Sequence, residues 1–371
     1  MQAVILVGGE GTRLRPLTSG TPKPIVTFVD RPFMGFMLGW LARHGVTDVV
    51  MCCGFLATKV KDVLGDGSAF GVQLRFVEEP EPRGTAGALK FAEALLEDRF
   101  LMLNGDTLTD IDLSAQIAQH ERTGAVGTLC LVPVEDPSAF GLVLRHEDTS
   151  VSGFLEKPGP DQLVGLDRYL VSGGIYVLER TVLDLIAPDQ NVSIETQIWP
   201  ALVGQGLYGF AADASSYWLD IGTPDRYLQG TADILTGAVE TAVSQRLDGS
   251  RQAIAGDVHP GARVTGPVII EAGATVAAGA TVKGPAIIGA GTTVAADATV
   301  DGAVILADCT IGAGAIVRGA ILSPNVTVGE RTVVSDLAML GDGVSVGADN
   351  VLGAAVKLFP GTALGDGAIK V

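Results

Sequence analysis

The sequence predicts an α/β domain followed by a solenoid of short strands, and three observations support this expectation. Within the first 250 residues, apolar runs typical of buried parallel strands alternate with stretches of helical periodicity. Beyond residue 251 aromatic residues almost disappear, because only Phe359 lies there. In the same last third an aliphatic residue returns every six positions, a period that suits neither an amphipathic helix nor a two-sided strand.

The first domain has several candidate strands and helices. Strands are expected at Ala3 to Val7, Asp48 to Cys53, Phe100 to Leu103 and Gly127 to Pro133, and helices at Ala86 to Leu96 and Leu113 to Glu121. Their alternation indicates a doubly wound sheet. Such a sheet binds its ligand beyond the carboxyl ends of the strands, so the loops after these runs are the candidate site.

The aliphatic residues of the last third define the expected coils. They fall at Val258, Val264, Ile270, Val276, Val282, Ile288, Val294, Val300 and Leu306, and after a ten-residue step at Ile316, Leu322, Val328, Val334, Leu340, Val346, Leu352, Leu358 and Leu364. The pattern resembles the hexapeptide repeat of the left-handed parallel β-helix, which implies about six triangular coils. The ten-residue step around Asp308 to Gly314 is expected to be a loop or a change of phase.

These patterns give the expected organisation. We expect an α/β fold with a doubly wound, Rossmann-like mixed sheet over residues 1–236, a linker over 237–256 and a left-handed β-helix over 257–371. A chain of 371 residues that is 47% hydrophobic can bury a substantial core.

Composition restricts the possible partners and the compartment. The net charge of -17, from 42 acidic against 25 basic residues, argues against nucleic acid and anionic membrane surfaces as partners. An anionic ligand would have to be small and held by a local basic cluster. The four cysteines form no CxxC pair, and the amino terminus has neither a basic region nor an apolar stretch long enough to cross a bilayer. We therefore expect buried thiols and a cytoplasmic protein.

A glycine-rich loop follows the first expected strand. It reads GGEGTRLRPLT from Gly8 to Thr18, and Pro22-Lys23-Pro24 comes shortly after it. Glycines let backbone N–H groups wrap an anion, while Arg13, Arg15 and Lys23 supply positive charge, so the loop predicts a polyphosphate ligand. The spacing excludes a P-loop and a GxGxxG fingerprint. The alternative is an ordinary strand-to-helix turn with solvated arginines.

The segment LVGGEGTRLRPLTSGTPKPIV resembles the signature of sugar-nucleotide pyrophosphorylases. These nucleotidyltransferases join a sugar 1-phosphate to a nucleoside triphosphate and release pyrophosphate. Further motifs in the family's order extend the resemblance to about residue 236: EEPEPRGTAGAL, LNGDTL, FGLV, FLEKP, GGIYVL, SIETQIWP and WLDIGTPDRYL.

The resemblance assigns catalytic roles. Arg13 would grip the triphosphate and the leaving pyrophosphate, and Lys23 would neutralise the α-phosphate during in-line attack. Asp106 and Asp220, which each end a strand-like run, would bind the Mg²⁺ that bridges the phosphates. Alternatively, Asp106 caps a turn and Asp220 is the N-cap of the helix at Pro224. Arg15 either binds phosphate or supports the loop.

The resemblance also implies two sets of binding residues. Nucleotide-binding residues would be Leu6, Gly8, Gly9, Gly11, Thr12, Arg13, Glu79, Gly84, Thr85, Asn104 and Gly105. Residues for the sugar phosphate would be Gly141, Glu156, Lys157, Ser172 and Gly173. Thr85 would open a helix whose amide donors face the nucleotide. Ser172 stands where many relatives have Asn, which leaves the identity of the sugar open.

Several functions remain to be distinguished. PKPIV, the Glu-Glu-Pro segment, SIETQIWP and the hexads most resemble the mannose-1-phosphate guanylyltransferase branch, which implies GTP and mannose 1-phosphate. Glucose-1-phosphate adenylyl- and thymidylyltransferases share most of these residues. An acyltransferase site in the β-helix would use His259, which otherwise reads as a surface turn residue. A non-catalytic sugar-nucleotide sensor or regulatory subunit is the third alternative. Sheet edges and flat faces of the β-helix predict a homo-oligomer.

Overall fold

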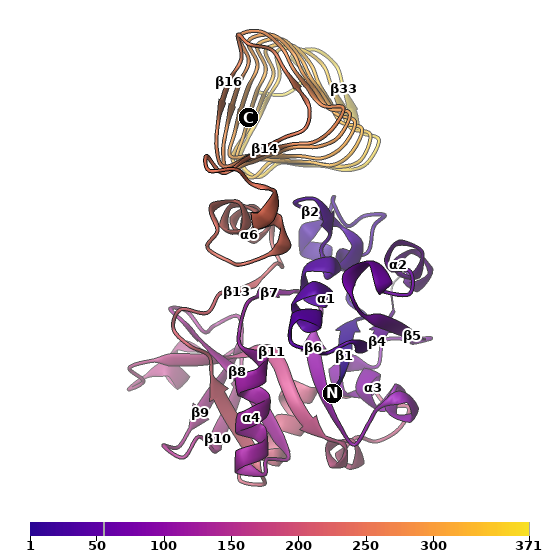
Figure 1. Cartoon of the computed structure of the whole chain (residues 1–371), viewed down its shortest axis with the longest axis vertical. Helices are drawn as coiled ribbons and strands as arrows, with labels where there is room; N and C mark the ends of the chain where they lie inside the picture. The colour runs from indigo at the N-terminus through magenta and orange to yellow at the C-terminus, as the bar shows by residue number, and fades with distance from the viewer. Residues whose placement is uncertain (55, 371) are drawn as a thin grey trace. The chain divides into compact units, whose positions relative to one another are not determined.

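The computed structural model describes residues 1–54 and 56–370, which form two compact units. The first unit contains residues 1–9 and 34–219, and the second contains residues 10–33 and 220–371 (Figure 1). The segment between residues 10 and 33 therefore packs with the last part of the chain. The domain limits expected at residues 236 and 257 stay predictions.

The first unit is built on a nine-stranded mixed sheet. Its main path runs β10-β9-β11-β6-β1-β4-β5, and β8 pairs with both β11 and β12. The strands are β1 (Gln2–Val7), β4 (Asp48–Cys53), β5 (Gln73–Glu78), β6 (Arg99–Asn104), β8 (Gly127–Val134), β9 (Gly141–Arg145), β10 (Val151–Glu156), β11 (Tyr169–Glu179) and β12 (Leu207–Ala211). Strands β1, β4, β5 and β6 are parallel, while β11 runs antiparallel to β6. The mixed α/β sheet is confirmed.

Helices connect the parallel strands of this sheet. They are α1 (Met34–Arg43), α2 (Ala57–Leu64), α3 (Gly84–Phe91) and α4 (Leu113–Thr123), with a short α5 (Trp199–Leu202). Helix α4 begins after Asp112, whose carboxylate accepts the Ala115 N–H at 3.1 Å, and it ends at Gly124. The helix predicted over Ala86 to Leu96 is divided into α3 and a 3-10 turn over Glu93–Leu95.

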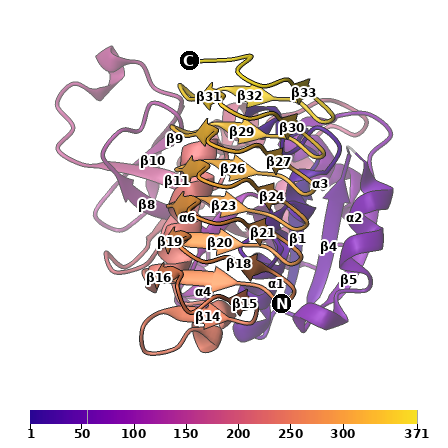
Figure 2. The same ribbon diagram turned by 90° about the horizontal axis from the view of Figure 1, so that it is seen from above.

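The second unit contains the β-helix, whose three parallel sheets form the three sides of each coil (Figure 1), and the coils stack on one another (Figure 2). The first sheet has β14 (Gln252–Ile254), β17 (Val268–Ile270), β20 (Ala286–Ile288), β23 (Val304–Ile305), β26 (Ile321–Leu322), β29 (Met339–Leu340) and β32 (Lys357–Leu358). The second has β15 (Asp257–Val258), β18 (Thr275–Val276), β21 (Thr293–Val294), β24 (Thr310–Ile311), β27 (Thr327–Val328), β30 (Ser345–Val346) and β33 (Ala363–Leu364). The third has β16 (Arg263–Thr265), β19 (Thr281–Lys283), β22 (Thr299–Asp301), β25 (Ile316–Arg318), β28 (Val333–Val334) and β31 (Val351–Leu352).

A loop, one expectation for the ten-residue step, is wrong, because the coils continue through Asp308 to Gly314. The alternative, a change of phase, occurs twice, once on each side of this segment. Strand β24 pairs with β21 and β27, and the inward residues of this region are Ile305, Ile311 and Val317 rather than Leu306 and Ile316. The two irregularities are five-residue steps, from Val300 to Ile305 and from Val317 to Leu322. At both places one glycine in the left-handed region makes the turn, where earlier coils use Gly-Pro.

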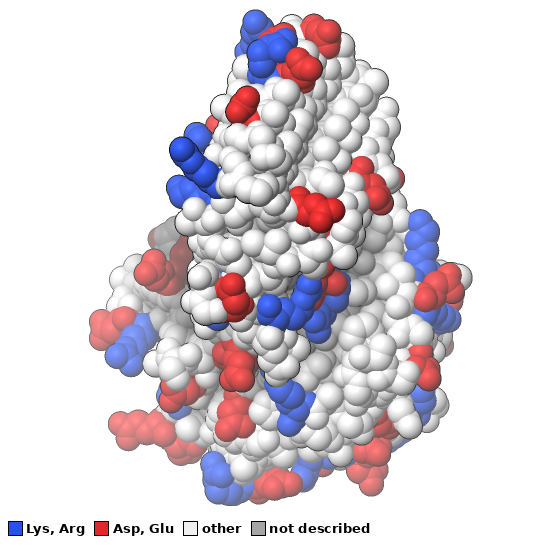
Figure 3. Space-filling model, turned by 45° about the horizontal axis from the view of Figure 1, so that its top comes forward, with Lys and Arg blue, Asp and Glu red and all other residues white. Residues whose placement is uncertain are grey.

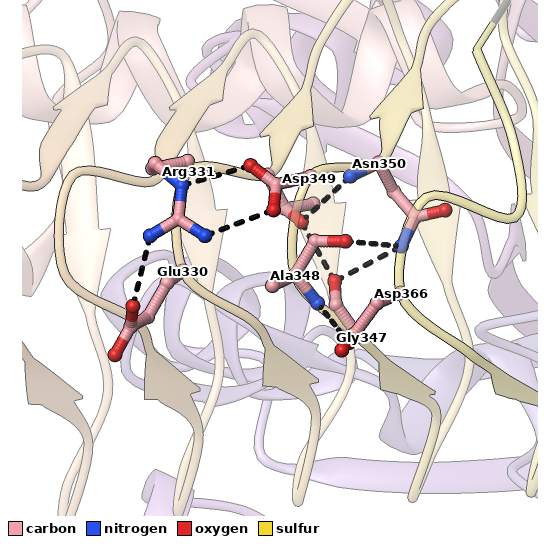
Figure 4. A network of polar contacts seen from close by, with 8 residues as sticks. Glu330, Arg331, Gly347, Ala348, Asp349, Asn350 and Asp366 are labelled. Carbon is pink, nitrogen blue, oxygen red and sulfur yellow. Dashed lines mark hydrogen bonds and ion pairs between the residues drawn. The ribbon is translucent and has the colours of Figure 1, made fainter.

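Polar side chains form hydrogen bonds between the last coils (Figure 4). The Arg331 guanidinium donates to both carboxylate oxygens of Asp349 at 2.8 Å, and it also donates to Glu330. The buried amide of Asn350 donates to the carbonyls of Gly347, Ala348 and Gly365. This amide satisfies turn carbonyls inside the solenoid that would otherwise lack donors.

The second unit also contains helix α6 (Pro224–Thr236) and a hairpin of β2 (Thr27–Phe28) and β3 (Arg31–Pro32). The Tyr227 hydroxyl, on α6, donates to the Thr27 carbonyl at 2.6 Å, and the rings of Tyr227 and Phe28 make an edge contact. These contacts attach the segment 10–33 to α6 within one core.

Two further features bear on the early expectations. Among the described residues no helix has the length and apolarity needed to cross a bilayer. All four cysteines are free and buried, as expected.

Candidate functional site

The basic side chains lie on a tight loop of the second unit, residues 10–18, which we call the arginine loop. Gly11 adopts φ 62°, and a β-carbon there would lie 3.2 Å from Lys23 Cβ and 3.3 Å from Thr18 Cγ2. The Thr18 hydroxyl donates to the Gly11 carbonyl at 2.8 Å. Gly11 thus allows the loop to close against Lys23, as the sequence motif requires.

Within the arginine loop, Thr12–Leu14 form a single 3-10 turn that carries Arg13. The N–H of Leu14 donates to the Gly11 carbonyl, and the N–H of Arg15 donates to the Thr12 carbonyl. The Arg15 side chain pairs with Glu10 at 2.7 Å, and both are exposed. Its contact is internal to the loop, which favours a supporting role for Arg15.

Three cationic side chains surround the carboxylate of Asp220. Lys23 Nζ lies 4.0 Å from Asp220 Oδ1, and Arg226 Nη1 lies 3.0 Å from Asp220 Oδ2. Arg13 is close as well, because a β-carbon added to Gly222 would lie 2.7 Å from Arg13 Nη2 and 3.0 Å from Asp220 Oδ1. We call Arg13, Lys23, Arg226 and Asp220 the basic cluster. Its excess of positive charge suits a polyphosphate.

The sequence analysis missed Arg226, although it lies in the WLDIGTPDRYL motif. Helix α6 begins at Pro224, and its N-cap is Thr223 rather than Asp220. The capping alternative for Asp220 is therefore wrong. Pro224 is a signal for a helix start, and side chains of a first turn lean back toward the preceding loop, so this signal could have identified Arg226.

Asp106 and Asp220 are associated with the short strands β7 (Thr107–Thr109) and β13 (Trp218–Asp220). Asp106 directly precedes β7, Asp220 ends β13, and β7 pairs with β13. No group of three or more metal-ligating side chains exists among residues 1–54 and 56–370. Carboxylate oxygens suit Mg²⁺, which takes few protein ligands and completes its shell with water or phosphate oxygens, and the metal role expected for Asp106 and Asp220 stays a prediction.

In the first unit, the expected nucleotide residues follow the parallel strands. The Gly105 N–H donates to the Leu6 carbonyl at 3.0 Å, and a β-carbon at Gly105 would lie 2.4 Å from Val7 Cγ1. Only glycine fits at this position, where β6 ends beside β1. Leu6 is paired with Asn104 in the same register, so these three predicted residues lie together.

Glu79 lies at the next strand end. It follows β5, its N–H donates to the Cys53 carbonyl, and its carboxylate accepts the Arg83 N–H at 3.3 Å. A β-carbon at Gly8 would lie 3.5 Å from Glu79 Oε1. Burial raises the pKa of the Glu79 carboxyl. Gly8 and Glu79 are therefore neighbours at the carboxyl edge of the sheet, as predicted.

The amides at the start of α3 contradict one expectation. The N–H groups of Ala86 and Gly87 donate to the Val192 carbonyl, so they serve the fold and not a ligand. The Thr85 hydroxyl is occupied too, because it donates to Glu195 at 2.7 Å and accepts the Ile194 N–H. The predicted nucleotide role of Thr85 cannot rest on these donors.

Gly84 shows why α3 and the SIETQIWP motif pack so closely. It adopts φ 70°, and a β-carbon there would lie 2.6 Å from the Val192 carbonyl oxygen. The motif itself forms a π-helical turn over Ile194–Ile198, a rare geometry that frequently marks functional sites. Sequence reasoning quoted the motif but gave no role to Glu195, which anchors it through Thr85 and Ser193.

Two of the predicted sugar-phosphate residues, Gly141 and Glu156, lie on the β9–β10 pair, and Lys157 directly follows β10. Glu156 is opposite Gly141, and a β-carbon at Gly141 would lie 3.1 Å from Glu156 Oε2 and 2.4 Å from the Phe154 ring. Burial raises the pKa of the Glu156 carboxyl, and the charge of Glu195 adds to the rise, against the effect of Lys157. The ammonium of Lys157 lies 3.5 Å from Glu156 and is largely exposed.

Ser172 and Gly173 lie near two aromatic side chains of the first unit. The Ser172 hydroxyl is 2.9 Å from the hydroxyl of the buried Tyr176, and Trp218 Nε1 donates to the Gly173 carbonyl at 2.8 Å. Trp218 also makes an edge contact with the Phe140 ring. Trp218 therefore packs beside the sugar motifs of the same unit, a contact that spacing alone could not reveal.

The alternative acyltransferase site has little around it. His259 is exposed in a turn, and its Nδ1 accepts the Gly261 N–H at 2.9 Å. This agrees with the interpretation of His259 as a turn residue. On the face shown in Figure 3, acidic and basic side chains are interspersed over a mostly uncharged surface, without a broad basic area.

Comparison with known proteins gives consistent results. A family model described as "Nucleotidyl transferase" matches residues 2–237, and one described as "GMPPB C-terminal domain" matches residues 264–364. Mannose-1-phosphate guanylyltransferase of Mycobacterium tuberculosis is 37% identical over 74% of this chain and 76% of its own length. Mannose-1-phosphate guanylyltransferase catalytic subunit beta of Drosophila pseudoobscura pseudoobscura is 34% identical over 74% and 70%.

Solved structures show a related fold for the first part of the chain. HddC from Yersinia pseudotuberculosis is 27% identical with a TM-score of 0.54, covering 62% of this chain and 96% of its own. The structure of HddC complexed with GMP-PN is 25% identical with a TM-score of 0.52 over the same shares of both chains.

Proposed function

Because the chain belongs to the nucleotidyl transferase family, we propose that it joins mannose 1-phosphate to GTP, giving GDP-mannose and pyrophosphate. The names of its relatives support the guanylyl and mannosyl parts of this proposal, and the GMP-PN complex of HddC supports the guanylyl part. The two family models together span both the α/β sheet and most of the β-helix.

The basic cluster is the observation that carries the proposal. The reaction brings an anionic sugar phosphate to an anionic triphosphate, so its barrier lies largely in charge repulsion and orientation. A phosphate oxygen of the sugar attacks the α-phosphorus in line, a new O–P bond forms, and the bond to the bridging oxygen breaks as pyrophosphate leaves with its electron pair. Arg13 and Lys23 would neutralise the charge on the phosphates during this exchange.

Mg²⁺ is the expected cofactor, and Asp106 with Asp220 would hold it. When bound, such an ion neutralises phosphate charge and orients the phosphates for attack. Asp220 would at the same time keep Lys23 and Arg226 in place by ion pairing. Glu156 would accept hydrogen bonds from sugar hydroxyls, and Lys157 would hold the sugar phosphate.

A panel of substrates tests the proposal. Purified enzyme is incubated with Mg²⁺, each of four nucleoside triphosphates and either mannose or glucose 1-phosphate, and pyrophosphate is measured. We expect the highest kcat/KM with GTP and mannose 1-phosphate. A preference for ATP or dTTP with glucose 1-phosphate would replace the guanylyl assignment with the adenylyl or thymidylyl alternative. If no pair of substrates releases pyrophosphate although the protein still binds nucleotide, the result would favour a non-catalytic sugar-nucleotide sensor.

We also propose a cytoplasmic homo-oligomer that associates through the β-helix. The second sheet supports this with a flat, exposed face of hydroxyl side chains: Thr275, Thr293, Thr310, Thr327 and Ser345. Light scattering on the full chain tests it, and the mass of one chain at micromolar concentration would contradict it.

A further inference from the structure

One face of the β-helix is buried although its side chains point away from the solenoid interior. On the first sheet, Ile270 and its equivalents fill the interior, and the residue before each of them points outward. These outward residues form a ladder in register and are at most 1% exposed: Ile269, Ile287, Val304, Ile321 and Met339. We call them the outer row. Its next rung is Lys357, opposite Met339.

The cover of the outer row belongs to the same unit. The side of the solenoid that carries β14 faces α6 and β2 (Figure 1). Arg246 makes one link across this side, because it pairs with Asp30 of the segment 10–33 at 2.5 Å and with Glu271, just after β17, at 3.0 Å. The segment that carries Arg13 and Lys23 is thus packed with the first sheet of the β-helix.

A local feature of the arginine loop gives Lys357 a role. In its 3-10 turn, the carbonyls of Gly11 and Thr12 accept N–H groups three residues ahead. The next carbonyl, that of Arg13, would require the N–H of residue 16, but residue 16 is proline and has none. Lys357 Nζ donates to this carbonyl at 3.0 Å. The β-helix therefore supplies the donor that Pro16 cannot.

We infer that Lys357 is a positioning residue for nucleotide binding. Its hydrogen bond holds the main chain of Arg13, and thereby the guanidinium that would meet the triphosphate. This inference rests on the proposed function for its kinetic consequence, but its structural part, immobilisation of the arginine loop, does not depend on activity. Loss of Lys357 should affect binding of the nucleoside triphosphate, because Arg13 is the residue that it holds, whereas the residues predicted for the sugar belong to β9, β10 and β11 or directly follow β10.

The test compares Lys357→Met with Lys357→Arg and with Lys283→Met. Methionine keeps most of the stem but removes the donor, and arginine keeps donors. Lys283 is a matched control, because it is an exposed lysine of the third sheet paired with Asp301 at 3.7 Å. Two readouts are used: hydrogen–deuterium exchange of a peptide covering residues 11–18 without ligands, and KM for each substrate.

In Lys357→Met we expect faster exchange in this peptide and a KM for GTP raised about three- to tenfold, with little change for mannose 1-phosphate. Lys357→Arg and Lys283→Met should resemble the wild type in both readouts. Unchanged exchange at residues 11–18 in Lys357→Met would overturn the inference, as would equal increases of both KM values. If the wild type releases no pyrophosphate, the proposed function fails, while the exchange experiment still decides the role of Lys357.

Discussion

The guanidinium of Arg226 lies 3.0 Å from the carboxylate of Asp220, on the turn that opens helix α6. Lys23 approaches the other oxygen of the same carboxylate. One acidic group thus keeps two cationic side chains in place without a ligand. Preformed charge of this kind costs no reorganisation when phosphates bind, which is how electrostatic stabilisation becomes effective in a site.

Replacing Lys23 should affect activity far more than replacing Arg15. Lys23→Ala removes a charge that would neutralise the phosphates, so we expect kcat/KM to fall at least about tenfold, the lower range for loss of an ionic hydrogen bond. Arg15→Ala breaks an exposed pair with Glu10 and should cost less than about threefold. Steady-state pyrophosphate release measures both. Equal losses in the two variants would argue against a distinct role for Lys23.

Removal of either aspartate should abolish metal-dependent activity without unfolding the protein. We expect Asp106→Asn and Asp220→Asn to lower kcat/KM by about 100-fold or more at saturating Mg²⁺, as loss of a metal ligand does. Asp225→Asn, an exposed acid on the first turn of α6, is the control. Activity should also disappear with a chelator and return with added Mg²⁺. Full activity of Asp106→Asn would remove that residue from the metal site.

Two glycines of the expected nucleotide site should separate stability from activity. Gly84→Ala places a β-carbon 2.6 Å from the Val192 carbonyl oxygen at φ 70°, so we expect a loss of about 2 kcal/mol or more in the free energy of unfolding. A β-carbon at Gly9 meets nothing within 4 Å. Gly9→Ala should therefore unfold like the wild type, within about 0.5 kcal/mol. If Gly9 approaches phosphate, this variant nevertheless loses activity. Urea titration and kinetics measure the two effects.

Glu156 should make sugar binding sensitive to acid. Its pKa is raised by burial and by Glu195, so the carboxylate, which would accept hydrogen bonds from sugar hydroxyls, becomes protonated at a higher pH than an ordinary glutamate. We expect KM for mannose 1-phosphate to rise as the pH falls through this raised pKa. Glu156→Gln keeps the titration of the substrate phosphate and should show a flatter profile. Identical profiles would exclude Glu156 as the titrating group.

The raised pKa of Glu156 means that acid, which should weaken sugar binding, should favour the folded state at this residue. A carboxyl with a raised pKa in the folded state costs stability while it is ionised, and the cost disappears as the pH falls through that pKa. Glu156→Gln should therefore be at least as stable as the wild type at pH 7. Thermal unfolding of the wild type and of Glu156→Gln, measured in buffers of different pH, tests whether the difference in stability has this sign.

The sequence predicted the elements well where local pattern determines them. The expected strands over Ala3 to Val7 and Asp48 to Cys53 are found, because central parallel strands read as continuous apolar runs. Hexads also predicted most inward residues of the β-helix. The hexad prediction is wrong between Val300 and Leu322. Two steps of five residues there add up to the same ten residues as the single step that was expected, so Leu306 and Ile316 are not the inward residues. Only pairing between coils resolves that ambiguity.

For the candidate site, the sequence indicated residues whose ligand roles stay predictions, and it did not indicate their connections. Motifs identified Arg13, Lys23 and Asp220, whereas Arg226 and Glu195 emerged from packing. Helix amides at Ala86 and Gly87 looked available for a ligand, but Val192, which lies over 100 residues away in sequence, accepts them. The contact between Lys357 and Arg13 spans almost the whole chain, and no local pattern encodes such a pair.

The outer row has a consequence for how such genes can recombine. A repeat array taken from an unrelated protein would need aliphatic residues of suitable size on one outer face in every coil. It would also need a cationic side chain at the position of Lys357. Without them, the segment 10–33 would face a surface to which it is not complementary. The repeats are therefore not an interchangeable module, and their outward residues should coevolve with the amino-terminal segment.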